Sequence, residues 1–325
     1  MMGTWPFGYV PFQKGGEVSN TKYNDEAYND LITTIFHDML YIESSYKSKM
    51  HLVREFSEIV VRRLSGFYNE FILTLGNERS RNFIKSKGIK EDWFWEAVDY
   101  INQHGSDSSH THKTEIPTED DFKMILDHLF TLYAYLFYDF FKKHSFGSNT
   151  EIVSKFSLLP PIIRYKTLEK LYDDSQNNTL IIDKLVLAII KAYDKKQAVD
   201  WVDINKDNLC ELHHPIDPEY KQQLIGILGE EAANRAIAEL EDNMYDYCLK
   251  QINLIDEYTS EFGILYDDFE SAAVYYRQEG HINGTSREIV DFNSLMEFVY
   301  CGRQEREKEL QEVRREQILE QKNDN

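Results

Sequence analysis

The chain has 325 residues and carries 56 aspartates and glutamates against 36 lysines and arginines, a formal net charge of −20. This charge argues against a protein whose whole surface coats nucleic acid, because phosphate binding needs clustered lysine and arginine. A local basic groove is still compatible with it. With only 7 prolines and 15 glycines, the composition also excludes collagen-like and low-complexity chains.

Residues 1–22 are rich in glycine and aromatic side chains and predict an irregular arm that lies on the body or on a partner. The arm lacks a positively charged segment followed by an apolar one, so we expect no signal peptide. The longest apolar run, 129–138, is far shorter than the roughly 20 residues that span a bilayer. Three widely separated cysteines fit a reducing cytoplasm and exclude a disulfide framework. We therefore expect a cytoplasmic protein without membrane contact.

Apolar residues at helical spacing predict three helices in the first part of the chain. The first begins after Asn24-Asp25, which we expect to cap it. The second runs from Leu52 to Leu75, with Gly76-Asn77 as its stop. The third covers residues 91–103 and leads into a polar, glycine- and serine-rich turn.

A strongly apolar helix is predicted after this turn. Pro117 and Thr118 are followed by acidic residues, which is typical of a helix N-terminus, and the helix is expected to reach Lys143. Its stretch 129–138 is apolar on almost every side, as in a helix at the centre of a bundle or at a subunit interface. Aromatic side chains that stack nucleic-acid bases normally alternate with basic residues, so this stretch favours core or interface packing.

The second half begins with a predicted joint at Pro160-Pro161, and we place a domain boundary in residues 146–160. Paired helices follow, and then one long helix beyond Pro218 whose apolar stripe runs to Phe262. Residues 235–270 hold ten acidic and two basic side chains. We expect this acidic surface to meet a basic partner or to imitate nucleic-acid phosphate.

No segment alternates between apolar and polar residues as a strand does, so the sequence predicts an all-α fold. On this basis the chain divides into four parts, which are an irregular arm (1–22), a helical bundle (23–145), a helical scaffold domain (160–300) and a charged C-terminal helix or tail (301–325).

Three segments of the predicted bundle share a pattern with a known family. Residues 52–60 read Leu-Val-Arg-Glu-Phe-Ser-Glu-Ile-Val, and residues 101–110 read Ile-Asn-Gln-His-Gly-Ser-Asp-Ser-Ser-His. Residues 114–121 read Thr-Glu-Ile-Pro-Thr-Glu-Asp-Asp and precede the aromatic helix. From Leu52 to Phe141 the chain thus resembles the HEPN superfamily, most of all its DUF4145-like branch. These are helical-bundle modules common in prokaryotic restriction, toxin and antiviral proteins.

The resemblance implies a site at the polar turn. Active members resemble metal-independent ribonucleases, in which a histidine acts as acid and base and an arginine stabilises the phosphate. His110 matches the family histidine, but Asn102 or Gln103 stands where the arginine is expected, and Ser106 replaces the family's asparagine. Without that cation, nothing nearby offsets the charge of a scissile phosphate. A module kept for assembly or ligand binding is therefore favoured.

Two further groups of residues are candidates at this turn. Arg62 or Arg63, on the helix that begins near Leu52, would supply the missing cation to His110 under a ribonuclease alternative. A second group, which would contact a ligand such as phosphate, comprises His104, Asp107 and His112. A polar turn is favoured over a metal site for these histidines, so we expect no metal and no cofactor.

Sequence motifs of P-loop ATPases, Rossmann dehydrogenases, zincins and α/β-hydrolases are absent. We therefore expect a non-catalytic interaction or assembly subunit of a prokaryotic antiviral, restriction or toxin-type complex. It would form a homo- or hetero-oligomer with protein partners, basic ones among them, and would meet nucleic acid only through a partner or a local groove. The alternative is a HEPN-like ribonuclease with a rearranged site. A weaker alternative is an acidic inhibitor that imitates nucleic acid.

Overall fold

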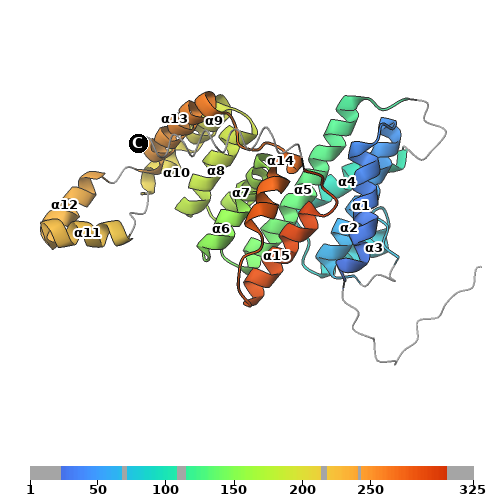
Figure 1. Ribbon diagram of the computed structural model, residues 1–325, viewed down its shortest axis with the longest axis horizontal. Helices are drawn as coiled ribbons and strands as arrows, with labels where there is room; N and C mark the ends of the chain where they lie inside the picture. Colours follow the sequence, from blue (N-terminus) through green and yellow to red (C-terminus); the bar gives the residue numbers. More distant parts are fainter. Residues whose placement is uncertain (1–22, 68–71, 108–114, 214–217, 241–242, 306–325) are drawn as a thin grey trace, which may run out of the picture.

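The fold is built from helices throughout the part of the chain that the structure describes (Figure 1). The structure is a computed structural model, and it describes residues 23–67, 72–107, 115–213, 218–240 and 243–305. In these ranges no strand forms, and the one isolated backbone bridge joins His213 to Asn243. The all-α prediction is therefore confirmed.

The helices of the first half are η1 (Glu26–Tyr28), α1 (Asn29–Phe36), η2 (His37–Tyr41), α2 (Tyr46–Ser65), α3 (Glu78–Ser86), α4 (Asp92–Asp107), α5 (Glu119–Lys143) and α6 (Thr150–Phe156). Those of the second half are α7 (Pro161–Asp174), α8 (Thr179–Ala192), α9 (Lys195–Ile204), α10 (Lys206–Glu211), α11 (Pro218–Leu228), α12 (Glu230–Leu240), α13 (Met244–Phe262), α14 (Phe269–Glu279) and α15 (Arg287–Tyr300).

Polar side chains determine where several of these helices begin. The Thr118 side chain accepts the Asp121 backbone N–H at 3.3 Å, and the Asp121 carboxylate accepts the Thr118 backbone N–H at 2.8 Å. This reciprocal capping box satisfies two backbone donors at the start of α5, so the predicted helix start is confirmed. Before α1, the Asn24 side chain accepts the Glu26 backbone N–H at 3.1 Å, whereas Asp25 makes no side-chain capping bond and its carboxylate pairs with Arg63.

The second predicted helix is shorter than the sequence suggested. α2 ends at Ser65, where Gly66 adopts a φ of 66°, a left-handed conformation in which glycine terminates helices at little cost. Asn77, predicted as part of the stop, instead begins α3 by accepting a backbone N–H of its first turn at 3.1 Å. Phe67 and Leu75 are nevertheless buried. The apolar pattern therefore reported the packing of a loop and not further helix.

The long helix predicted after Pro218 is also divided. Asn243 caps α13 by accepting the Asp246 backbone N–H at 2.9 Å, and the Met244 N–H donates to the Leu212 carbonyl oxygen at 2.7 Å. α11 and α12 pack against each other and extend away from the other helices (Figure 1). The acidic residues of 235–270 therefore do not share one helix face.

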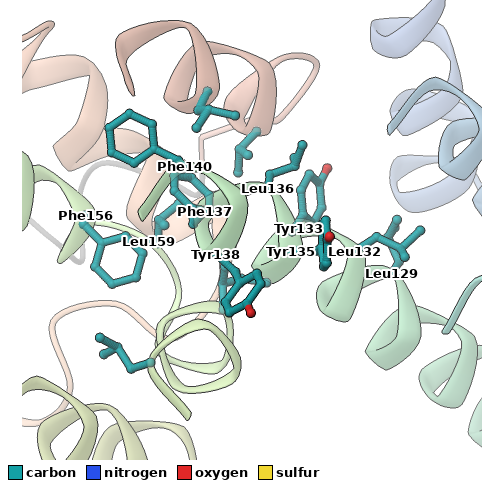
Figure 2. Packing of buried hydrophobic residues seen from close by; sticks show 14 of the residues in the cluster. Leu129, Leu132, Tyr133, Tyr135, Leu136, Phe137, Tyr138, Phe140, Phe156 and Leu159 are labelled. Carbon is teal, nitrogen blue, oxygen red and sulfur yellow. The ribbon is translucent and has the colours of Figure 1, made fainter. Parts of the chain in front are cut away.

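α5 lies at the centre of the fold and is covered by its own chain. α2, α4 and α7 pack along it, and α15 returns beside it (Figure 1). Figure 2 shows aromatic and leucine side chains leaving α5 in several directions. The Tyr133 ring centroid is 5.8 Å from that of Phe56 on α2, and Tyr135 is 4.4 Å from Phe94 on α4. Of the two roles expected for this helix, the structure shows burial in the core, so the rings of Tyr133 and Tyr135 are not available to a copy or a partner.

The core continues through residues 146–160, where a domain boundary was predicted. Phe156 in this segment is buried (Figure 2), and the Phe137 ring centroid lies 5.6 Å from that of Phe156 and 6.2 Å from that of Phe292 on α15. The Tyr300 hydroxyl donates to the Leu158 carbonyl oxygen at 2.8 Å. Because α15 folds back onto α5, the expected bundle (23–145) and scaffold (160–300) do not correspond to two separate cores.

The predicted C-terminal helix or tail (301–325) is described only as far as Glu305. Residues 301–305 are not helical, and Arg303 among them is buried. The predicted arm (1–22) and residues 306–325 lie outside the described residues. Within the described ranges, no helix combines the length and the apolar character needed to cross a membrane.

Replacing Phe137 by alanine is expected to lower the free energy of unfolding by about 3–5 kcal/mol, because this fully buried ring would leave a cavity. Met124→Ala is the control, since it truncates a side chain on the same helix that is 52% exposed and should change stability by about 0.5 kcal/mol at most. Urea unfolding followed by circular dichroism measures both changes. Equal losses would contradict a core centred on α5.

Candidate functional site

His104 lies on α4 and takes part in a stack of rings between α4 and α5. Its ring centroid is 3.9 Å from that of Tyr100, and the Tyr100 centroid is 4.0 Å from that of His128 on α5. The His104 Nδ1 atom lies 2.9 Å from the Tyr100 carbonyl oxygen. Burial lowers the pKa of His128, so this imidazole is neutral at pH 7. The sequence did not single out His128, because it stands alone on a mostly apolar helix.

The other predicted residues of the turn are only partly covered by the structure. His110 and His112 fall within residues 108–114, outside the described residues, and only the backbone of Asp107 is described, at the end of α4. Their catalytic and ligand-binding roles therefore stay predictions. The described part fixes the two ends that the segment connects, which are the last turn of α4 and the capped start of α5.

Arg54 is an arginine of α2 that reaches the end of α4. Its Nε atom lies 3.4 Å from Asn102 Oδ1, and its guanidinium pairs with Glu58 at 3.1 Å. A Cβ atom at Gly105 would lie only 2.5 Å from the Cβ of Arg54, so glycine permits the close approach of the two helices. A cation therefore stands beside Asn102, one of the two positions where the HEPN resemblance leads us to expect an arginine.

Arg63, one of the two predicted cations, is held toward the other end of α2. Nine residues after Arg54, it lies roughly 13 Å further along the helix axis. Its Nε atom is 2.9 Å from the Asp25 carboxylate, and its Nη2 donates to Ser294 Oγ at 2.7 Å. Arg62 precedes it in the same last turn. Arg63 thus connects α2 to α15, and its side chain does not lie at the end of α4.

A groove of about 590 Å³ opens beside residues 303–305. Its floor is apolar and includes Leu126 and Phe130 of α5 and Ile162 of α7. Residues from the end of η2 and the start of α14 complete the lining. Because these segments are far apart in the sequence, no local motif marks the groove.

Arg303 is buried in the wall of the groove between two phenylalanine rings. Its guanidinium carbon lies 4.1 Å from the ring centroid of Phe36 and 4.2 Å from that of Phe269, and such cation–π contacts are strongest away from water. Gly302 precedes it with a φ of 73°, and a Cβ atom there would lie 2.9 Å from the Thr33 Cα. Glycine therefore lets the chain turn against α1 and insert the arginine.

Hydrogen bonds hold the charge of Arg303 in place. Its Nη1 atom lies 3.3 Å from Glu270 Oε1, and the Tyr41 hydroxyl donates to the same oxygen at 2.7 Å. The Tyr41 oxygen in turn accepts the Gln304 backbone N–H at 3.0 Å. Burial raises the pKa of Tyr41 to about 12, so it is a donor at neutral pH. Although burial opposes the charge of Arg303, the nearby Tyr133 and Glu270 leave its pKa above the ordinary value.

The groove is lined by four acidic residues, which are Asp267, Asp268, Glu270 and Glu305. Among the described residues of this lining, Arg303 is the one cation. Glu305 pairs with Arg277 at 3.0 Å, whereas the Asp267 side chain is exposed to solvent. A lining that combines acidic and apolar residues is complementary to a segment that combines basic and apolar side chains.

Sequence patterns missed this site because they assigned Arg303 to a solvated C-terminal helix or tail. The signal in the sequence was the position of Arg303, which stands two residues after the apolar run that ends at Tyr300 and Cys301. Within the described ranges, no group of three or more histidine, cysteine, aspartate and glutamate side chains is arranged to hold a metal ion.

Comparisons with known proteins add no family to this picture. A scan against protein-family models gave no match, and searches among curated proteins and among solved structures also gave none. The HEPN resemblance accordingly depends on the residues quoted for it and stays a prediction.

Replacing Arg303 by alanine is expected to lower the free energy of unfolding by about 3–5 kcal/mol, because Glu270 would lose its buried partner. The control is Arg287→Ala, which removes an exposed ion pair with Asp291 on α15 and should cost about 1 kcal/mol or less. Urea unfolding measures both variants. A loss at Arg303 no larger than that of the control would contradict a structural role for this ion pair.

Proposed function

We propose that the protein is a non-catalytic interaction subunit, and that the groove beside Arg303 receives a partner segment with basic and apolar side chains. The observation that carries this proposal is a lining that combines four acidic residues with apolar ones such as Leu126, Phe130 and Ile162. The one cation of the described lining is already paired with Glu270, so the exposed charge left for a partner is negative.

The size of the groove supports a role in binding. Its volume of about 590 Å³ lies within the range of roughly 300–1,000 Å³ that is typical of ligand-binding clefts. It accommodates a few side chains of a partner segment and not a folded domain. Burial of apolar side chains supplies most of the affinity in such a site, and the acidic residues of the lining select the partner and fix its orientation.

The kind of complex follows from the HEPN resemblance and not from the groove. We place the protein in a prokaryotic antiviral, restriction or toxin-type assembly, as a subunit that contacts protein partners. The sequence pattern of residues 52–141 supports this part of the proposal. The packing of α2 and α4 against α5 is compatible with it, since the resemblance implies a helical bundle over the same residues.

A ribonuclease is the second candidate, because Arg54 stands beside Asn102. In this alternative Arg54 supplies the cation, in place of Arg62 or Arg63, and His110 acts as acid and base. The guanidinium of Arg54 already pairs with Glu58 at 3.1 Å, and this carboxylate competes with a phosphate for the charge. The non-catalytic role is therefore the first choice.

The groove proposal predicts that a fluorescein-labelled peptide of alternating lysine and leucine binds the full chain more tightly than one of alternating lysine and serine. Asp267→Asn should weaken binding of the first peptide about three-fold, the effect of one screened ion pair. Fluorescence anisotropy at low and high salt measures the affinities. Higher salt should weaken the binding because it screens the acidic residues of the lining.

Glu257→Gln is the matched control, because Glu257 is an exposed carboxylate on α13 that does not line the groove. It should leave the peptide affinity unchanged. Equal losses from Asp267→Asn and Glu257→Gln would indicate binding to general negative charge. That outcome would contradict the groove and favour the weaker alternative, an inhibitor that imitates nucleic acid.

The two leading functions differ in what the purified protein does to RNA. With single-stranded RNA and EDTA, we expect no cleavage above that of a buffer blank, because the proposed role involves no chemistry. Gel electrophoresis of end-labelled RNA provides the measurement, with His110→Ala and Arg54→Ala as parallel samples. Metal-free cleavage by the wild type that disappears in both variants would overturn the non-catalytic proposal and establish the ribonuclease.

A further inference from the structure

A second and smaller pocket, of about 190 Å³, lies between α7, α8 and α13, three helices that lie together in Figure 1. It shares no lining residue with the groove beside Arg303. Two of its lining residues are cations, Arg164 from α7 and Lys191 from α8. The rest of the lining is mainly apolar and comes from α13 and the segment that follows it.

Arg164 is a buried cation without a counter-charge in the described part of the chain. Its side chain belongs to a residue only 7% exposed, and its Nε–H is buried without an acceptor. The nearest aromatic neighbour is Tyr266, whose ring centroid lies 5.8 Å from the guanidinium carbon. Burial lowers the pKa of Arg164, and the neighbours that oppose this shift are the phenols of Tyr266 and Tyr300, not carboxylates.

Lys191 adds a second positive charge to the same pocket. Burial lowers its pKa to about 8, and the positive charges of Arg164 and Lys184 act in the same direction. Lys184 has its own counter-charge, because its ammonium lies 2.9 Å from the Asp183 carboxylate. Lys191 and Arg164 thus both line the pocket, and the described residues of its lining include no carboxylate.

A buried cation without a counter-charge, such as Arg164, is costly, because a charge removed from water needs a partner or a hydrogen bond, and the half-buried Lys191 adds a second positive charge beside it. The cost is notable in a chain whose net charge is −20, where carboxylates are abundant elsewhere. Buried groups that are unsatisfied in this way are often completed by a ligand. An anion placed between the two side chains would satisfy both.

We propose that this pocket binds a small carboxylate that carries a short apolar chain. The carboxylate would lie between Arg164 and Lys191, because a guanidinium and an ammonium both donate to its oxygens. The chain of the ligand would lie against Ile255, Phe262 and Leu265, which make the pocket a poor match for a fully hydrated inorganic anion. The volume of about 190 Å³ is below the roughly 300 Å³ at which clefts for larger ligands begin, which excludes a nucleotide.

The test uses hexanoate as the probe, at pH 7.0, with isothermal titration calorimetry on the full chain. Hexan-1-ol has the same chain without the charge, and inorganic phosphate has the charge without the chain. Hexanoate is expected to bind. Hexan-1-ol and phosphate should each bind at least about ten-fold more weakly, because the first lacks the charged group and the second lacks the apolar chain. Phosphate that binds as tightly as hexanoate, or hexanoate that does not bind, would overturn the proposal.

Variants of the two cations connect this binding to the pocket. Lys191→Gln should weaken hexanoate binding about ten-fold, whereas Lys191→Arg should keep it, because a charged donor is retained. Lys196→Gln, an exposed lysine nearby in the sequence, should leave the affinity unchanged. A loss that is equal in Lys191→Gln and Lys196→Gln would refute a specific site.

Arg164→Met separates a ligand-binding role from a structural one. If Arg164 exists to bind an anion, removing its unpaired buried charge should leave the ligand-free protein at least as stable as the wild type. The variant should then bind hexanoate at least about ten-fold more weakly. A protein that is less stable but binds hexanoate with unchanged affinity would show that Arg164 is structural and would overturn the proposal.

Discussion

The burial of residues 132–138 of α5 on all sides is the constraint on which the rest of the structure depends. A helix whose every face is apolar has no stable position at a surface, so other helices must surround it. The chain meets this demand with segments from both halves, since α2 and α4 come before α5 and α7 and α15 come after it. The contact of Phe137 with Phe156 and Phe292 is one result of it. The domain boundary that Pro160-Pro161 led us to predict in residues 146–160 therefore lies inside a shared core.

The candidate groove also depends on the packing of other helices around α5. Once α15 lies beside α5, the residues after it are brought to η2 and the start of α14, where Arg303 lies between Phe36 and Phe269. The arginine and Glu270 neutralise each other inside the wall, and exposed charge such as that of Asp267 is left in the lining. A structural ion pair and the surface proposed to bind a partner thus arise from a single arrangement.

The sequence predicted those structural features that depend on residues close together in the chain. The capped start of α5 at Thr118 and the burial of its apolar run depend on neighbouring residues, and the sequence predicted both. The end of α2 at Gly66 did not follow from the pattern, because Phe67 and Leu75 are buried in a loop and continue the helical spacing. The groove and the pocket of Arg164 and Lys191 were beyond sequence patterns, since a charged residue is buried only through partners that are distant in the chain.

The glycine that lets Arg303 enter the wall has a consequence for the order of events during synthesis. Gly302 turns against Thr33 of α1, so a contact of very long sequence separation closes the structure, and contacts of this kind form late in folding. A ribosome-bound chain that has already exposed α1 and α5 has no groove until the residues after α15 emerge. Under the proposed function, a partner would therefore find this surface only on a chain in which residues 302–305 have already been synthesised.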